Sequence, residues 1–122
     1  MSELKDRALP RRLWNGLAGL AHGWRRERSL RTQAIASVAA LLVLLAVRAA
    51  LPWLLALLAI LAVGLAAELV NAALEALLDR LHPGHDAEIG AAKDMSSAAV
   101  LVINLASTAV FVVALLETLQ QQ

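Results

Sequence analysis

The sequence predicts an all-α membrane protein, with an N-terminal amphipathic surface helix followed by three transmembrane helices. Hydrophobic residues make up 60% of the 122 residues and the mean hydropathy is +0.67, whereas soluble domains contain roughly 45–50% apolar residues. Turn-forming residues at Pro52 and at Pro83-Gly84 divide the apolar sequence into three runs. Eight of the eleven basic residues precede the first run, which predicts a cytoplasmic N-terminus.

The N-terminal part is expected to lie on the membrane surface rather than within it. Residues 1–10 are polar and mixed in charge, and we predict a flexible lead there. Within residues 11–33, large apolar side chains recur at spacings of four, three and four residues, while most basic residues fall on other faces: Leu13, Leu17, Leu20 and Trp24. This pattern predicts an amphipathic interfacial helix.

Residues 34–116 are predicted to form a three-span membrane domain. The first apolar run, residues 34–47, is 14 residues long, shorter than the roughly 20 that cross a bilayer. It can still span the membrane if the preceding helix continues into it and the Arg48 side chain extends to the far interface. The other predicted boundaries are a second span within 51–81, a polar cytoplasmic loop at 82–94, a third span at 98–116 and an extracytoplasmic tail at 117–122.

The second predicted span carries one stripe of polar side chains. Its members are Glu68 and the residues three, seven and eleven positions after it, which are Asn71, Glu75 and Asp79. A charge at the centre of a membrane helix costs about 2.5–3.5 kcal/mol, so the glutamates need metal, protonation or partner charges. Such a pair can bind a hard cation or supply a general base. The alternative is a pair of protonated or hydrogen-bonded glutamates that seal a helix bundle. The expected partners are Arg31, Lys93 and, through a shared metal, Glu27.

Several other polar residues have both a functional and a structural interpretation. Lys93 could reach a phosphate and Asp94 a nucleotide or metal, or the two could simply begin a helix. Glu27 and Arg31 are four residues apart and could form only a surface pair. A shared face of the third span is expected to form interhelical hydrogen bonds rather than a site: Asn104, Ser107 and Thr108.

The sequence argues against several function classes. It contains no phosphate-binding G-x-x-x-x-G-K-[ST] loop, no G-x-G-x-x-G run and no cysteine. His82 and His85 have no third ligand spaced with them, so we expect no metal site there. Nucleic-acid binding is not expected, because anionic lipid explains basic residues beside a membrane segment. An enzyme, an ion or proton pathway and a structural assembly subunit remain as hypotheses for the carboxylate stripe.

Three runs together carry a family pattern. They are Trp24-x-x-Glu27-x-x-x-Arg31, Glu68-x-x-Asn71-x-x-x-Glu75-x-x-x-Asp79-Arg80 and Gly90-x-x-Lys93-Asp94-Met95-x-Ser97-Ala98-Ala99-Val100. From about Leu13 to Leu116 the chain resembles the prokaryotic diacylglycerol kinase family, which includes the undecaprenol kinases. The resemblance implies a homotrimeric helical bundle in the bacterial inner membrane, with active sites shared between protomers on the cytoplasmic side.

The resemblance also implies transfer of the ATP γ-phosphate to a lipid hydroxyl. It makes Glu27 and Glu75 ligands of Mg²⁺, and Glu68 the base that accepts the hydroxyl proton. It further implies a set of residues around the nucleotide: Arg31, Asn71, Asp79, Gly90, Lys93 and Asp94. Asp79-Arg80 and residues 95–100 favour diacylglycerol as the acceptor, while Thr32-Gln33 departs from both family types and leaves undecaprenol as the alternative.

Overall fold

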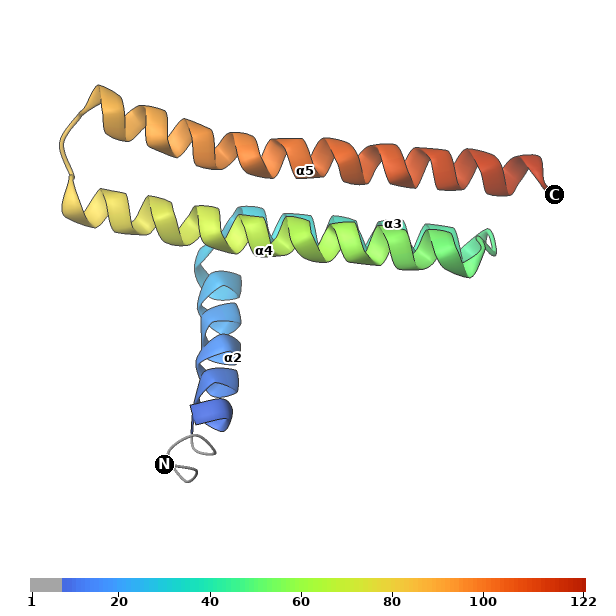
Figure 1. Cartoon of the computed structure of the whole chain (residues 1–122), viewed down its shortest axis with the longest axis horizontal. Helices are drawn as coiled ribbons and strands as arrows, with labels where there is room; N and C mark the ends of the chain where they lie inside the picture. Colours follow the sequence, from blue (N-terminus) through green and yellow to red (C-terminus); the bar gives the residue numbers. More distant parts are fainter. Residues whose placement is uncertain (1–7) are drawn as a thin grey trace.

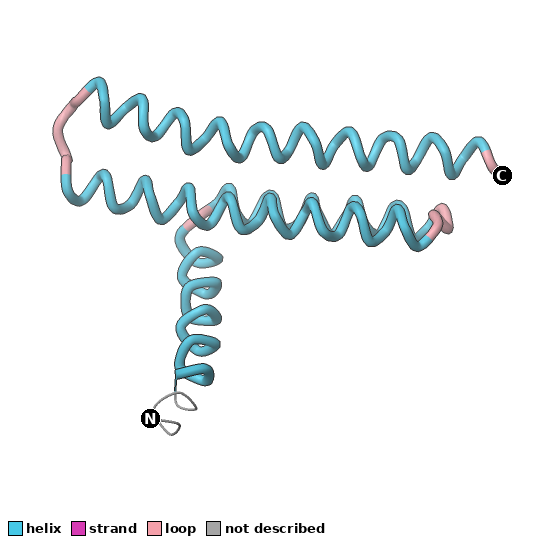
Figure 2. Tube along the Cα trace, in the orientation of Figure 1, coloured by secondary structure: helices cyan, strands magenta, loops and turns pink. Residues whose placement is uncertain are grey.

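The computed structural model describes residues 8–122, and this part of the chain is entirely helical apart from short connections. Its elements are α2 (Ala8–Arg26), α3 (Arg28–Ala46), α4 (Leu51–Leu81) and α5 (Ala87–Gln120). Figure 1 shows α3, α4 and α5 running alongside one another, while α2 extends crosswise from the bundle. The connections between the bundle helices lie only at its ends (Figure 2).

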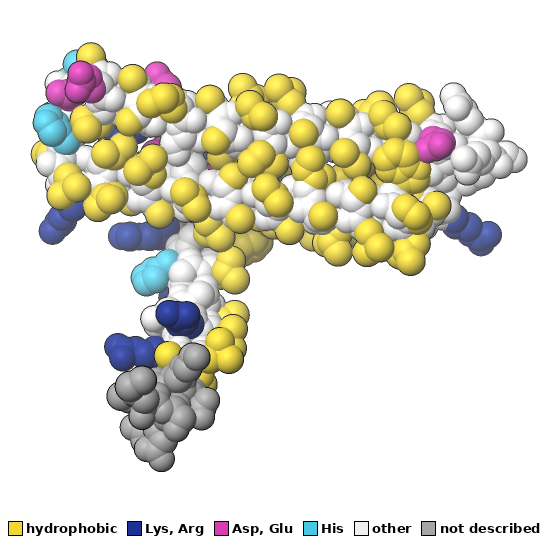
Figure 3. All heavy atoms as spheres, in the orientation of Figure 1, with side chains coloured by type: hydrophobic (Ala, Val, Ile, Leu, Met, Phe, Trp, Pro, Cys, Tyr) yellow, Lys and Arg dark blue, Asp and Glu magenta, His cyan; other side chains and the backbone are white. Residues whose placement is uncertain are grey.

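Each of the three bundle helices is long and apolar enough to cross a membrane. They contain 19, 31 and 34 residues, with mean hydropathies of 1.7, 2.4 and 2.5 in their most apolar windows. Charged side chains gather at the ends of the bundle and on α2, and apolar side chains cover the part between (Figure 3). The predicted all-α architecture with three spans is therefore confirmed.

The chain breaks at Glu27, so the prediction of one helix over residues 11–33 is wrong, although its last part, from Arg28 on, does continue into the first span. Glu27 adopts extended backbone angles, with φ −102° and ψ 109°, between α2 and α3. The Arg31 guanidinium donates hydrogen bonds to the carbonyls of Trp24 at 2.7 Å and Arg25 at 3.2 Å. These bonds satisfy carbonyls that the end of a helix leaves free. Because α3 already begins at Arg28, it reaches 19 residues without any contribution from α2.

The start of the predicted surface helix and the end of the third span also differ from expectation. The helix α2 begins at Ala8 rather than Arg11, and proline is tolerated in this first turn because its missing N–H would have no partner there. Most of the predicted flexible lead, residues 1–7, lies outside the described residues. At the other end α5 runs on to Gln120, so Glu117–Gln120 belongs to the helix rather than to a tail.

The loop between α4 and α5 is shorter than predicted. The Asp86 carboxylate accepts hydrogen bonds from the backbone N–H groups of Glu88 at 2.9 Å and Ile89 at 3.1 Å. An acidic cap of this kind starts a helix by satisfying its first donors. The loop therefore ends at Asp86, and Lys93 and Asp94 lie within α5 rather than before it.

Buried positions recur every seven residues along the bundle helices. They are Leu30, Ser37 and Leu44 in α3, Leu57 and Gly64 in α4, and Val100, Ser107 and Ala114 in α5. A seven-residue repeat keeps one seam of each helix facing its neighbours, as in left-handed helix bundles. The apolar core lies at the end of the bundle away from α2, around Leu44, Leu57 and Ala114.

Truncation of the core should destabilise the bundle. Leu57 is fully buried, and Leu57→Ala is expected to lower the free energy of unfolding by about 2–5 kcal/mol, because it removes packing and leaves a cavity. Reversible denaturation in detergent micelles measures this change. Leu58→Ala is the matched control, since Leu58 is 51% exposed and should lose far less. Equal losses in the two variants would contradict the burial of Leu57 in the core.

Candidate functional site

The polar stripe of α4 runs from the interior of the bundle to its end. Glu68 is only 6% exposed, Asn71 and Glu75 are half-buried, and Asp79 is exposed. At a rise of about 1.5 Å per residue, Glu68 and Glu75 are separated by about 10 Å along the helix axis. The two glutamates thus occupy different places and can have different roles.

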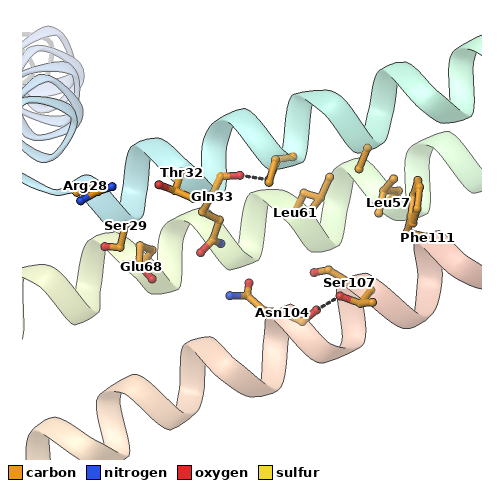
Figure 4. Close-up of a pocket in the computed structure, with 14 residues that line it drawn as sticks. Arg28, Ser29, Thr32, Gln33, Leu57, Leu61, Glu68, Asn104, Ser107 and Phe111 are labelled. Carbon is orange, nitrogen blue, oxygen red and sulfur yellow. Dashed lines mark hydrogen bonds between the residues drawn. The ribbon is translucent and has the colours of Figure 1, made fainter.

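Glu68 opens onto a cavity of about 670 Å³ between α3, α4 and α5. Figure 4 shows that the lining changes in character along the cavity. Arg28, Ser29 and Glu68 lie at one end, Gln33 and Asn104 follow, and the apolar side chains of Leu57 and Phe111 lie at the other end. The cavity is therefore amphiphilic, with its charged end toward the α2 side of the bundle.

The side chain of Asn71, three residues after Glu68 on α4, has an oxygen atom that accepts no hydrogen bond from the described part of the chain. Its Oδ1 atom is buried and has no hydrogen-bond donor among residues 8–122. A buried polar atom without a partner costs about 1–3 kcal/mol, so such an atom marks a place where a donor or a cation fits. Together with the Glu75 carboxylate, one helical turn farther along α4, it offers the oxygen ligands that Mg²⁺ prefers.

Glu27 approaches α4 from the junction of α2 and α3. It lines a small cavity of about 250 Å³ together with His22 and the α4 residues Leu69 and Ala72. This places it beside the same helix that carries Glu75. Across residues 8–122, however, no group of three or more acidic, histidine or cysteine side chains is close enough to hold a metal ion.

At the end of the stripe, Lys93 on α5 forms an ion pair with Asp79 on α4. The structure therefore brings together two residues that the family resemblance implies lie around the nucleotide. Asp94 follows on the exposed surface, and Gly90 lies one helical turn before it, half-buried. Arg31 does not pair with Glu27, because its guanidinium is held by the α2 carbonyls; the possible surface pair between these two residues is not formed.

The sequence profile of the prokaryotic diacylglycerol kinase family matches residues 14–115. This match extends from α2 to α5 and includes Glu27, the α4 stripe and Lys93. The chain belongs to this family. A direct comparison with curated proteins found no match. Membership of the family supports a membrane lipid kinase as the function, and the three long apolar helices make this kinase a multi-pass membrane protein.

In this member of the diacylglycerol kinase family, a polar layer crosses the bundle beside Glu68. It contains Gln33 on α3, Gly64 on α4 and Asn104 on α5. We expected the α5 residues to form interhelical hydrogen bonds, but the Ser107 hydroxyl donates to the Ile103 carbonyl at 2.8 Å and the Thr108 hydroxyl to the Asn104 carbonyl at 2.9 Å. These bonds stay within α5, because a hydroxyl on a helix reaches the carbonyl four residues earlier.

Sequence reasoning missed the role of Gly64 in this kinase. An added Cβ at Gly64 would lie 2.9 Å from Nε2 of Gln33 and 3.6 Å from Oδ1 of Asn104. A glycine in the middle of a membrane helix is a signal of close approach by neighbouring groups. It does not reveal which groups approach, since these come from two other helices.

The cap of α5 gives the kinase a pH-dependent feature outside the membrane. Hydrogen bonds from Ile89 and Glu88 hold the pKa of the Asp86 carboxyl below 3.8, its ordinary value. A carboxyl whose pKa is depressed on folding contributes stability that is present above pH 3.8 and is lost as the pH falls through the lower folded value. The amide resonances of Glu88 and Ile89 in micelles should shift together in that acidic range.

Asp86→Asn is the matched test of this cap. The asparagine oxygen still accepts both hydrogen bonds but does not titrate. The variant should keep the resonances of Glu88 and Ile89 constant over the range in which they move in the unmodified protein. A titration that persists in Asp86→Asn would assign the shift to a group other than the Asp86 carboxyl.

Proposed function

We propose that this chain phosphorylates a diacylglycerol, with ATP as the phosphoryl donor and phosphatidic acid and ADP as products. The observation that carries the proposal is the amphiphilic cavity beside Glu68. A buried carboxylate at the polar end can meet a lipid hydroxyl, while the apolar end suits acyl chains. Its volume of about 670 Å³ falls within the roughly 300–1,000 Å³ of small-molecule sites.

In the proposed reaction Glu68 is the general base. Its carboxylate accepts the proton of the lipid hydroxyl as the hydroxyl oxygen attacks the γ-phosphorus of ATP. The new phosphorus–oxygen bond forms while the bond from the γ-phosphorus to the bridging β,γ-oxygen breaks, and ADP leaves. Phosphoryl transfer depends mainly on alignment and on compensation of charge, so a fixed cavity and a positioned base suit it.

We propose that Glu27 and Glu75 hold Mg²⁺, with the Asn71 oxygen nearby. When bound, the ion compensates negative charge on the ATP phosphates. The Oδ1 atom of Asn71 supports this proposal, because it is buried without a hydrogen-bond donor from residues 8–122. A cation beside it would supply the missing interaction. We propose a second group of residues for the nucleotide: Arg31, Asp79, Gly90, Lys93 and Asp94.

We further propose a homotrimer in the bacterial inner membrane, with sites shared between protomers and facing the cytoplasm. Membership of the prokaryotic diacylglycerol kinase family supports this assembly. Apolar side chains face one side of α2 and basic ones the other (Figure 3). This distribution supports an interfacial position for α2, with its basic side chains near anionic lipid headgroups.

The acceptor experiment tests this function directly. Purified protein in mixed micelles receives labelled MgATP with either diacylglycerol or undecaprenol, and label transferred to lipid is measured. We expect label on diacylglycerol. Label on undecaprenol alone would keep the lipid kinase and overturn the acceptor, whereas ion flux through proteoliposomes without nucleotide and without lipid labelling would favour an ion pathway instead.

Loss of the base should slow the chemical step. Glu68→Gln keeps the size and hydrogen-bonding capacity of the side chain but removes its basicity, and we expect kcat to fall by about 10²–10⁴-fold. Steady-state lipid phosphorylation measures the change. Glu88→Gln removes an exposed carboxylate from the start of α5 and serves as the control for the loss of one negative charge. A kcat equal to that of the unmodified protein in Glu68→Gln would overturn the assignment of the base.

A further inference from the structure

We infer that the carboxamides of Gln33 and Asn104 bind the ester carbonyl group of the acceptor lipid and so select an esterified glycerol over a simple alcohol. The inference rests on the proposed kinase function and assigns a specificity-determining pair for it. Both residues line the cavity beside Glu68, and Figure 4 shows them between the charged end and the apolar end.

The two carboxamides converge on one point from different helices. An added Cβ on Gly64 of α4 would lie 2.9 Å from Nε2 of Gln33 on α3 and 3.6 Å from Oδ1 of Asn104 on α5. Because Gly64 has no side chain, it leaves room for both amide groups beside its backbone. A larger residue at this position would push the Gln33 amide out of its place.

The N–H groups of these amides are free to donate to a ligand, whereas the neighbouring hydroxyls already donate within their own helices. The Ser37, Ser107 and Thr108 hydroxyls each donate to a carbonyl of their own helix, at 2.7, 2.8 and 2.9 Å. Neither carboxamide has a hydrogen bond to another side chain in residues 8–122, and Figure 4 shows both beside the cavity. Each carboxamide carries two N–H donors, so this layer fits a ligand that presents carbonyl oxygens.

The depth of the layer matches the chemistry of an esterified glycerol. Gly64 precedes Glu68 by four residues, which is about 6 Å along the helix axis. In a diacylglycerol the ester carbonyls lie only a few bonds from the free hydroxyl, so one can reach this layer while the hydroxyl meets Glu68. A polyprenol places hydrocarbon at the same depth, so the half-buried amides of Gln33 and Asn104 gain no acceptor from it.

The experiment compares two acceptors that differ only in the carbonyl. We would measure kcat/KM for 1,2-dioctanoylglycerol and for its diether, 1,2-dioctylglycerol, in mixed micelles with MgATP. The unmodified protein should prefer the ester by about tenfold, which is the effect of one net hydrogen bond. Asn104→Leu and Gln33→Leu should each reduce this preference toward unity, chiefly through KM for the ester.

Two further variants keep the test decisive if a leucine substitution prevents folding. Gly64→Ala should lower the ester preference by displacing the end of the flexible Gln33 side chain. Thr108→Val is the matched control. It removes from the same cavity a hydroxyl that already donates its hydrogen bond within α5. The ester preference should stay unchanged. An equal loss of preference in Thr108→Val would show that the general polarity of the cavity, rather than the two amides, selects the ester.

The outcomes separate this inference from the proposed function. Equal kcat/KM for ester and diether in the unmodified protein would overturn the amide assignment and leave the kinase intact. Phosphorylation of undecaprenol but of neither glycerol derivative would do the same. If the assembled protein phosphorylates none of the three lipids, the proposed kinase function itself is overturned, and the amide assignment with it.

Discussion

The rest of the bundle must accommodate one buried acid, the Glu68 carboxylate. Only 6% of this residue is exposed, and a charged group in such surroundings is costly unless a partner or a polar environment compensates it. The cavity beside it is polar at this end, where Arg28 and Ser29 of α3 lie, and Gln33 and Asn104 follow along it. A buried acid is tolerated here because the bundle encloses a polar space beside it rather than packing solidly against it.

This polar space and the apolar core share one packing seam. The seven-residue repeat that buries Leu44, Leu57 and Ala114 at one end of the bundle also aligns Gly64 and Ser107 farther along it. Close packing at the apolar end fixes the helices relative to one another. The wider polar section near Glu68 can then remain a cavity without loss of the bundle, since the core that stabilises the helices lies elsewhere.

The α2 helix depends on contacts with the bundle rather than on continuity with α3. A Cβ added to Gly23 would lie 2.7 Å from Cδ2 of Leu69, so this glycine allows α2 to pack closely against α4. The Arg31 guanidinium then ties the last carbonyls of α2 to α3. Together these contacts hold Glu27 at a corner beside α4, where a straight helix would carry it away from the stripe.

The sequence by itself determined the three spans and the carboxylate stripe of α4, because hydropathy and helical spacing are local properties that each helix keeps in any packing. It also predicted the family, because the family pattern consists of residue types at fixed positions along the chain and does not depend on the tertiary structure. The tertiary structure decided the break at Glu27, the Lys93–Asp79 pair and the meeting of Gln33 with Asn104. Each of these depends on contacts between helices, and no spacing within one segment specifies which neighbour a side chain will face.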